Sequence, residues 1–132
     1  MEPSIDSLDH LVLTVANLKR TISFYSNCLG MTPEQFDASD GSTRWALRFG
    51  FQKINLHLAG KEFEPKARQS TPGAADICFL SSVPITHWKV HLNMNRVPIE
   101  LGPVRRSGAT SPILSIYLRD PDGNLIEIAN RI

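Results

Sequence analysis

The chain has 132 residues, of which 42% are hydrophobic and 20% are charged. These values are typical of a globular protein, and the length suits one domain with one core. The formal net charge of +1 gives no electrostatic reason to expect a nucleic acid or a membrane as partner. Two cysteines are too few for a secreted disulfide scaffold, and no signal-peptide pattern opens the sequence. We therefore expect a cytoplasmic protein.

The first predicted strand, residues 8–15, alternates apolar and polar side chains. His10 lies on its polar face. The apolar face carries Leu11, Leu13 and Val15. A helix should follow from the cap residue Asn17 to about residue 29, and Gly30 is placed to end it. A lone histidine in a strand is more often half-buried than a ligand, so the meaning of His10 depends on what lies near it.

Three short strands should complete the first half of the chain. They are residues 31–36, 45–49 and 53–58. Pro33 suggests that the first of them is a sheet edge, because proline cannot donate to a hydrogen-bond ladder. The last one reads KINLHL and alternates sharply. One of its faces is fully apolar, and the other carries Lys53, Asn55 and His57.

The polar stretch 60–74 predicts either a lid or a crossover between two halves of the chain. The strand that follows, residues 76–80, places Asp76 and Cys78 on one face. Asp76 is either a cap at the strand edge or a functional carboxylate. Cys28 and Cys78 are both interpreted as small core residues.

A helix should begin after Pro84 and run over residues 85–95. His87 and His91 have the four-residue spacing of a helical metal pair, but their polar neighbours favour an exposed helix face. Four further segments complete the chain. They are a strand at 97–101, a basic flexible loop at 104–111, and two hairpin strands at 113–118 and 125–129 joined by a DPDG turn.

The order strand, helix, strand, strand, strand therefore occurs twice. We predict one α+β domain, residues 1–132, made of two βαβββ modules at about 5–59 and 75–132. If the curved mixed sheets of the two modules face each other, their polar faces surround a cavity. The apolar faces then pack against the helices.

Each module has a potential metal ligand in its first strand and another in its last strand. His10 and Asp76 lie 66 residues apart (76 − 10), and His57 and Glu127 lie 70 apart (127 − 57). Two imidazoles and two carboxylates are a suitable ligand set for a divalent transition metal. The alternative is four independent polar residues on solvated sheet faces, and the repetition of the positions favours the common site.

Several motifs resemble the vicinal oxygen chelate superfamily, which includes glyoxalase I, extradiol dioxygenases and bleomycin-binding proteins. The motifs are LDHLVLTV, a helix ending in FYxxxLGM, and RDPDGNLIEI. Two further stretches, INLHLAGKEFEPK and GPVxRxGAxxPILSIY, are similar to the glyoxalase domain-containing protein 5-like group of poorly defined activity. The resemblance covers nearly the whole chain and implies the fold of this superfamily.

The resemblance also implies a divalent metal ion, which would be zinc, nickel, cobalt, manganese or iron. It implies that His10, His57, Asp76 and Glu127 are the metal ligands, and that Asp76 or Glu127 transfers the proton in catalysis. The sequence departs from glyoxalase I at His57 and Asp76, where that enzyme typically has a carboxylate and a histidine, respectively. The ligand set as a whole still contains two histidines and two carboxylates, as in glyoxalase I.

The expected activity is that of a lyase or isomerase acting on a small hydroxy-carbonyl or thiol-adduct substrate. Two alternatives remain open: a small-molecule binding protein of the bleomycin-resistance type, and an Fe(II) extradiol-type dioxygenase that uses His10, His57 and Glu127. Candidate substrate contacts share the polar strand faces. They are Asn55, Lys53, Arg48, Ser115 and Tyr117, and Arg48, Arg105 and Arg106 are candidates for an anionic tail.

We further expect a homodimer. A polar sheet face that carries ligands needs a second sheet opposite it, and in this superfamily the halves pair either within a chain or between chains. Pairing between chains would take His10 and His57 from one chain and Asp76 and Glu127 from the other.

Overall fold

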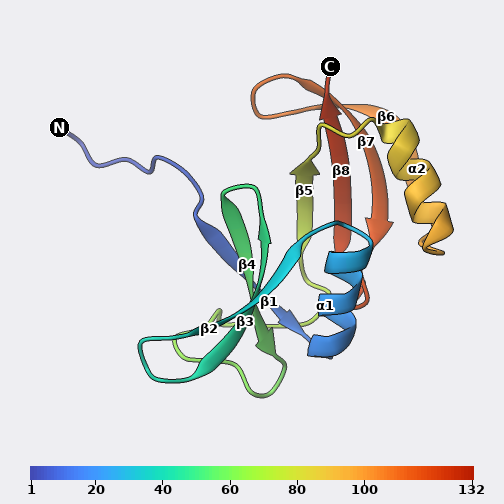
Figure 1. Cartoon of the computed structure of the whole chain (residues 1–132). Coiled ribbons are helices and arrows are strands. Elements are labelled where there is room, and N and C mark those ends of the chain that lie inside the picture. Colours follow the sequence, from blue (N-terminus) through green and yellow to red (C-terminus); the bar gives the residue numbers. More distant parts are fainter. The chain divides into compact units, whose positions relative to one another are not determined.

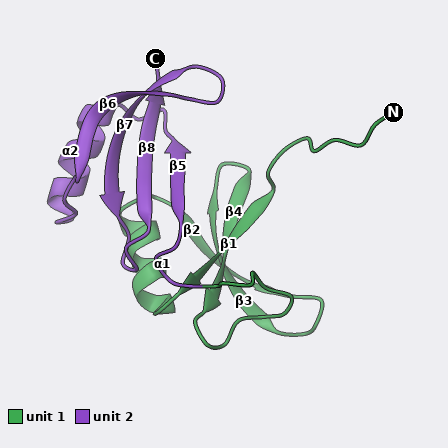
Figure 2. Ribbon diagram, turned by 180° about the vertical axis from the view of Figure 1, so that it is seen from behind, with its two compact units in different colours: residues 1–70 green, residues 71–132 purple.

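The computed structural model describes all 132 residues of the chain. It divides into two compact units, residues 1–70 and 71–132 (Figures 1 and 2). Each unit contains one helix and one four-stranded sheet in the order βαβββ. The predicted α+β fold with a repeated βαβββ module is confirmed, and the boundary between the units lies within the polar stretch 60–74.

Unit 1 contains β1 (His10–Val15), α1 (Leu18–Asn27), β2 (Thr32–Asp37), β3 (Thr43–Phe49) and β4 (Gln52–Leu58). The sheet order is β1-β4-β3-β2, with β1 parallel to β4 and the other neighbours antiparallel. β2 is an edge strand, as Pro33 predicted. Asn17 caps α1 as predicted, because its side-chain Oδ1 accepts a hydrogen bond from Arg20 N at 2.9 Å.

The apolar faces of the strands form the core of unit 1. Val15, Leu47 and Ile54 are completely buried there, and α1 adds the completely buried ring of Tyr25. Burying such side chains stabilises the fold by about 1.5–3 kcal/mol each. His57, from the opposite face of β4, is the one histidine that is buried.

Unit 2 contains β5 (Asp76–Leu80), α2 (Ile85–Met94), β6 (Leu101–Ser107), β7 (Pro112–Arg119) and β8 (Leu125–Arg131). The sheet order is β5-β8-β7-β6, with β5 parallel to β8 (Figure 1). α2 contacts β7 and β8. Its buried Leu92 packs on the sheet face that carries Ile116, Ile126 and Ile128. The other face of this sheet is left for polar residues.

The strand predicted at 97–101 is wrong, as is the loop predicted at 104–107. Val97 N bonds to Leu92 O and so belongs to the turn that ends α2, and Pro98 has no N–H to give to a ladder. Strand β6 begins only at Leu101 and then runs through the basic residues as far as Ser107, pairing with β7. The sequence pattern missed this strand because Gly102, Pro103 and the pair Arg105–Arg106 give it no apolar alternation.

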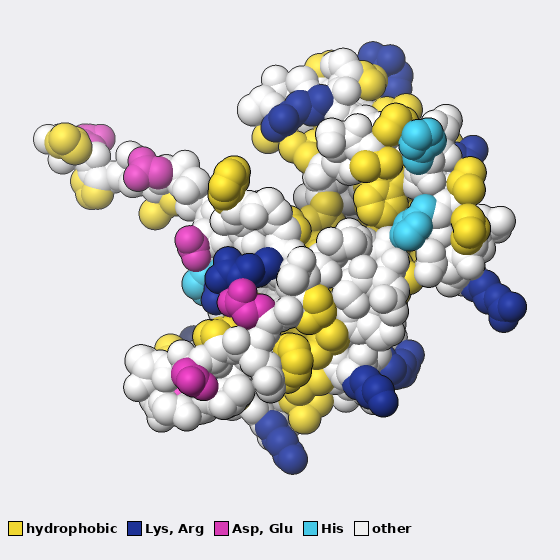
Figure 3. Space-filling model, in the orientation of Figure 1, with side chains coloured by type: hydrophobic (Ala, Val, Ile, Leu, Met, Phe, Trp, Pro, Cys, Tyr) yellow, Lys and Arg dark blue, Asp and Glu magenta, His cyan; other side chains and the backbone are white.

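On the face shown in Figure 3, the lysine and arginine side chains are scattered rather than gathered into one patch. His87 and His91 are exposed, as predicted for a polar helix face. No helix of the structure is both long and apolar enough to cross a membrane.

The DPDGN turn between β7 and β8 is held by a buried polar network. The Asp120 carboxylate accepts hydrogen bonds from Asp122 N, Asn124 N and Asn124 Nδ2 at 2.8–2.9 Å. Asn124 Oδ1 in turn accepts a bond from Ala75 N at 2.8 Å. Since Ala75 directly precedes β5, this network fixes the start of β5 beside β8 and therefore the position of Asp76.

We predict that Asn124→Ala lowers the free energy of unfolding by about 2–3 kcal/mol, because it removes the acceptor of the Ala75 N–H and one of the three donors to the buried Asp120 carboxylate. The matched control Asn93→Ala, at an exposed site on α2, should change it by less than about 0.5 kcal/mol. Urea unfolding followed by circular dichroism measures both. Equal effects of the two substitutions would contradict the role given to Asn124.

Candidate functional site

In unit 1, His10 and His57 lie on the same sheet face but far apart along it. Strands β1 and β4 are parallel, and their register pairs His10 with Lys53 and Thr14 with His57. The two imidazoles are therefore offset by four residues, or roughly 13 Å of strand. Metal–nitrogen bonds are only about 2 Å long. The predicted sharing of one metal by His10 and His57 does not fit this register.

A different residue of β4 lies closer to His10. Asn55 is on the same face as Lys53, the register partner of His10, and is two residues further along the strand. Such diagonal neighbours are roughly 7–8 Å apart at Cα, a separation that side chains can bridge through a common ligand.

Unit 2 repeats this relation with two carboxylates. Asp76 at the start of β5 pairs with Leu125 of β8, and Glu127 is two residues further along β8 on the same face. Asp76 and Glu127 are thus diagonal neighbours, just as His10 and Asn55 are. The predicted placement of both carboxylates on one face of the sheet is found in the structure.

Superposing the two registers identifies equivalent positions in the two units. Asn55 of β4 corresponds to Glu127 of β8, and His57 corresponds to Ala129. The spacing between the true equivalents is 72 residues (127 − 55), not the 70 that relates His57 to Glu127. Internal repetition therefore points to Asn55, rather than His57, as the fourth position of the ligand pattern.

Two local features make His10 and Asn55 suitable donors. His10 Nδ1 is hydrogen bonded to Asp9 Oδ2 at 2.8 Å, which leaves Nε2 available. This carboxylate–histidine arrangement is common at metal sites, and the bond to His10 is the main reason why the pKa of Asp9 is lowered. Asn55 Oδ1 is buried and has no hydrogen-bond partner. A buried amide oxygen left without a partner costs about 1–3 kcal/mol.

His57 instead packs against the segment that follows β4. Its ring meets the Phe63 ring edge to face at 5.4 Å between centroids, and the Arg44 guanidinium lies 4.0 Å from the centre of the Phe63 ring. Burial is the main cause that lowers the pKa of His57, and the nearby positive charge of Arg44 lowers it further. His57 is therefore neutral at pH 7 and has the surroundings of a packed side chain.

The cationic side chains predicted to contact substrate already have partners within unit 1. The Lys53 ammonium lies 4.0 Å from the centre of the Phe36 ring. Arg48 forms an ion pair with Glu34, and this contact lowers the pKa of the Glu34 carboxyl. Neither charge is free for a ligand without losing such a contact.

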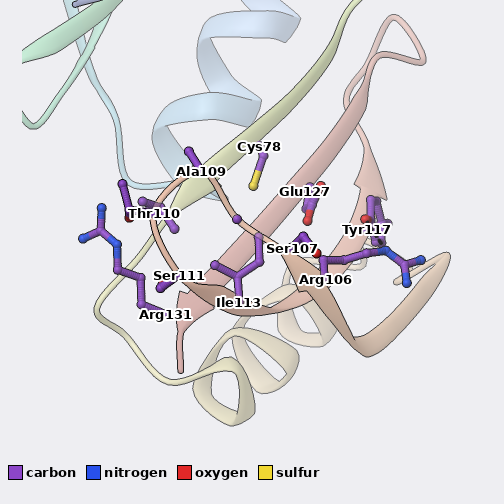
Figure 4. Close-up of a pocket in the computed structure, with 12 residues that line it drawn as sticks. Cys78, Arg106, Ser107, Ala109, Thr110, Ser111, Ile113, Tyr117, Glu127 and Arg131 are labelled. Atoms are coloured by element: carbon purple, nitrogen blue, oxygen red, sulfur yellow. Dashed lines mark hydrogen bonds between the residues drawn. The ribbon is translucent and has the colours of Figure 1, made fainter.

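The polar sheet face of unit 2 contains a cavity of about 640 Å³ (Figure 4). Its walls come from β5, β7, β8, the end of β6 and the turn that joins β6 to β7. Glu127 and Tyr117, a register pair of β8 and β7, both line it. These two predicted site residues are brought together by the fold.

The carboxylate of Glu127 is held by two donors inside this cavity. The Ser115 hydroxyl donates to Glu127 Oε2 at 2.6 Å, and the Cys78 thiol also forms a hydrogen bond with Glu127. Ser115 is completely buried. Ser115 was predicted to contact substrate, but its hydroxyl hydrogen already belongs to Glu127, so its role is to orient the carboxylate.

Cys78 was wrongly interpreted as a core residue, because it is exposed and lines the cavity. Cys28, in contrast, is buried as predicted. Partial desolvation and then the charge of Glu127 raise the pKa of Cys78 to about 11. The thiol is protonated at neutral pH and serves as a hydrogen-bond donor. The alternation that placed Asp76 and Cys78 on one face was the available signal.

The hydroxyl of Tyr117 is hydrogen bonded to Arg106, a residue that the sequence pattern had placed in a loop. Arg106 Nε donates to the Tyr117 hydroxyl at 3.0 Å, and the Arg106 guanidinium lies 5.6 Å from the Tyr117 ring centre. Because the Tyr117 oxygen accepts this bond, its own hydrogen remains available for a ligand. Arg131 and the turn residues 107–111 also line the cavity, and no sequence motif pointed to them.

No group of three or more His, Cys, Asp or Glu side chains in the structure is placed to hold a metal ion by itself. The ligand assignments to His10, Asp76 and Glu127 therefore stay predictions, and so does that of His57, which the register of β1 and β4 disfavours. The register adds Asn55 to them as an oxygen donor.

We predict that alkylation of Cys78 by iodoacetamide in metal-free protein is slow at pH 8 and accelerates toward pH 11, because only the thiolate reacts. Glu127→Gln removes a negative charge beside the thiol. The pKa of Cys78 should then fall, and the rate at pH 8 should rise about three- to tenfold. Peptide mass spectrometry separates Cys78 from the buried Cys28. An unchanged rate in the variant would contradict the contact between Cys78 and Glu127.

Comparison with known proteins gives two close relatives. The virulence protein STM3117 of Salmonella typhimurium is 51% identical over 128 residues, which cover 97% of this chain and 86% of that protein. The glyoxalase domain-containing protein RDO1 of Mycosarcoma maydis is 51% identical over 127 residues, covering 96% of this chain and 69% of that protein.

Solved structures agree with the sequence relatives. The crystal structure of STM3117 has a TM-score of 0.92 at 50% identity, covering 98% of this chain and 100% of that one. Lactoylglutathione lyase from Agrobacterium tumefaciens has a TM-score of 0.70 at 20% identity, covering 97% and 96%. The second likeness shows the fold alone. Residues 7–128 match the sequence pattern of one family, and the chain belongs to that family, the Glyoxalase/Bleomycin resistance protein/Dioxygenase superfamily.

Proposed function

We propose that this protein is a metal-dependent enzyme of glyoxalase type, a lyase or isomerase that acts on a small hydroxy-carbonyl compound or thiol adduct. The observation that carries the proposal is Glu127, a carboxylate fixed by Ser115 and Cys78 in an open cavity. Asp76 lies diagonally beside it on β5. A carboxylate held in one orientation at a ligand cavity is suited to accept a proton from carbon.

The proposed metal donors are His10, Asn55, Asp76 and Glu127. One imidazole nitrogen and three oxygens suit manganese, iron, cobalt, nickel or zinc. The buried, unpartnered Oδ1 of Asn55 and the Asp9 bond to His10 support this set. Asn55 takes the place that the sequence pattern had given to His57.

A bound divalent ion would polarise two adjacent substrate oxygens and so acidify the C–H bond beside them. Glu127 would take this proton from the carbon that bears the hydroxyl and return it to the former carbonyl carbon, while the hydroxyl proton passes to the former carbonyl oxygen, so that hydroxyl and carbonyl exchange places. The hydrogen bond from Ser115 would hold the Glu127 carboxylate in one orientation during both proton transfers. The free hydroxyl hydrogen of Tyr117 would bind a substrate oxygen, because Arg106 already occupies the Tyr117 lone pair.

A second candidate function is a binding protein that holds a small molecule without turning it over. The apolar cavity walls at Leu80, Ala109 and Ile113 favour it, since binding sites are mostly apolar with a few polar groups. The Fe(II) dioxygenase alternative required His10, His57 and Glu127 as one triad, and the offset of the two histidines gives that triad no support.

We predict that protein purified without added metal retains a transition metal, measured by inductively coupled plasma mass spectrometry. His10→Ala and Glu127→Gln should each lower metal affinity by at least about tenfold, because each removes one ligand. The exposed His91 offers the matched control, and His91→Ala should change nothing. A wild-type protein that binds no metal from the first transition row would exclude the enzyme proposal and favour the binding protein.

The fourth donor is tested by a second pair of substitutions. Asn55→Ala should lower metal affinity about tenfold, whereas His57→Ala should leave it within about twofold, because His57 is four residues away from the His10 register position. The opposite order of effects would restore His57 as the ligand.

We also propose that the protein forms a homodimer with donors shared between chains. Leu80 and Leu101 are 51% and 47% exposed, and a partner that covered them would remove apolar surface from water. A closed two-fold pair is the commonest oligomer. Sharing would combine His10 of one chain with Glu127 of the other.

Mixing inactive His10→Ala and Glu127→Ala proteins after subunit exchange should then restore about a quarter of the wild-type activity, because half of the dimers are mixed and each carries one intact site. Activity is measured with a substrate of the wild-type protein. A monomer in analytical ultracentrifugation at micromolar concentration would refute the dimer. Complete exchange without recovery would refute sharing.

A further inference from the structure

The cavity of unit 2 has an excess of positive charge that the proposed chemistry does not use. Arg106 and Arg131 line it together with a single carboxylate, Glu127, which gives a formal balance of +1 (2 − 1). Neither guanidinium forms an ion pair with a carboxylate of this protein. One further negative charge from a ligand would balance the cavity.

The two ends of the cavity differ in chemistry. Figure 4 shows Arg106 and Tyr117 at one end, near Glu127, and Arg131 with Thr110 at the other. Arg106 is tethered by its bonds to the Tyr117 hydroxyl and to the Arg105 carbonyl. Arg131 has no such tether, so its guanidinium is the one that is free to bind a ligand.

The turn that carries Thr110 is a fixed structure, although the sequence predicted a flexible loop. Gly108 N donates to Ser111 O at 2.9 Å, and the Ser111 hydroxyl donates to Pro112 O at 3.0 Å. A Cβ on Gly108 would lie 2.4 Å from Ser111 O, so the turn closes more tightly than any other residue would allow. This geometry holds Thr110 at the cavity wall beside the Arg131 end.

We propose that the ligand of this cavity is a small organic monocarboxylate whose charged end is bound by Arg131 and Thr110. A planar guanidinium matches a carboxylate with two parallel hydrogen bonds, and the threonine hydroxyl adds a third donor. Ile113 and Ala109 also line the cavity and would contact an apolar body. Only the orientation of the ligand, with its reacting oxygens toward Glu127, rests on the proposed function.

Charge selects the carboxylate over a phosphate group. In the metal-free protein a monocarboxylate brings one negative charge and neutralises the side chains that line the cavity, whereas a phosphate dianion would leave one negative charge uncompensated. The short apolar wall further favours a compound with a few carbon atoms over an inorganic ion.

The test titrates full-length, ¹⁵N-labelled, metal-free protein in EDTA with butyrate, with the neutral isostere butyramide and with inorganic phosphate. Butyrate should shift the amide signals of residues 109–111, with an affinity at least about tenfold above that of butyramide, because a charged hydrogen-bonded pair is lost in the amide. Arg131→Gln should reduce butyrate affinity about tenfold, and Thr110→Val should reduce it several-fold.

The matched control is Arg105→Gln, which removes an arginine of the same strand as Arg106 that does not line the cavity. Its butyrate affinity should equal that of the wild type. Equal binding of butyrate and butyramide, or undiminished binding by Arg131→Gln, would overturn the proposal. Tighter binding of phosphate at the same signals would replace the organic acid with an inorganic anion. Because no metal is present, none of these outcomes depends on metal binding, which is measured separately.

Discussion

The parallel pairing of the first and last strands within each module is the constraint on which the rest of the structure depends. It places β1 beside β4 and β5 beside β8, although more than 35 residues separate the paired positions His10 and Lys53 or Asp76 and Leu125. A slip of one residue would turn every side chain of a strand to the other face. In unit 2 the buried Asn124 side chain prevents such a slip, because it bonds to the backbone directly before Asp76.

The sequence predicted the fold well where local chemistry decides the structure. Alternation located the paired strands, Asn17 marked the start of α1, and the DPDG turn marked the last hairpin. It failed at β6, where Gly102 and Pro103 interrupt the alternation and two arginines follow Val104. A prediction based on apolar periodicity has no means to detect such a strand.

The sequence predicted which face of each strand carries the candidate site residues, but it did not predict which positions along the strands lie next to each other. Alternation correctly gave the polar face of β4, yet it gave Asn55 and His57 equal standing. Only the register distinguishes them, and counting residues between modules misleads because the connecting segments differ in length. The contacts of Glu127 were equally hidden, since Ser115 and Cys78 come from two different neighbouring strands.

The two modules carry different kinds of side chain at equivalent positions. Equivalent positions carry neutral donors in unit 1, His10 and Asn55, and carboxylates in unit 2, Asp76 and Glu127. Two ionised carboxylates balance a divalent cation (2 − 2 = 0), so the proposed donor set as a whole is electroneutral. It then offers no net charge with which to attract a substrate anion. In the proposed arrangement the guanidinium of Arg131 would supply that attraction. It lies at the end of the cavity away from Glu127, where it would not neutralise the proposed base. Such a separation of base and anion-binding group would let one small cavity both bind a negative ligand and remove a proton from it.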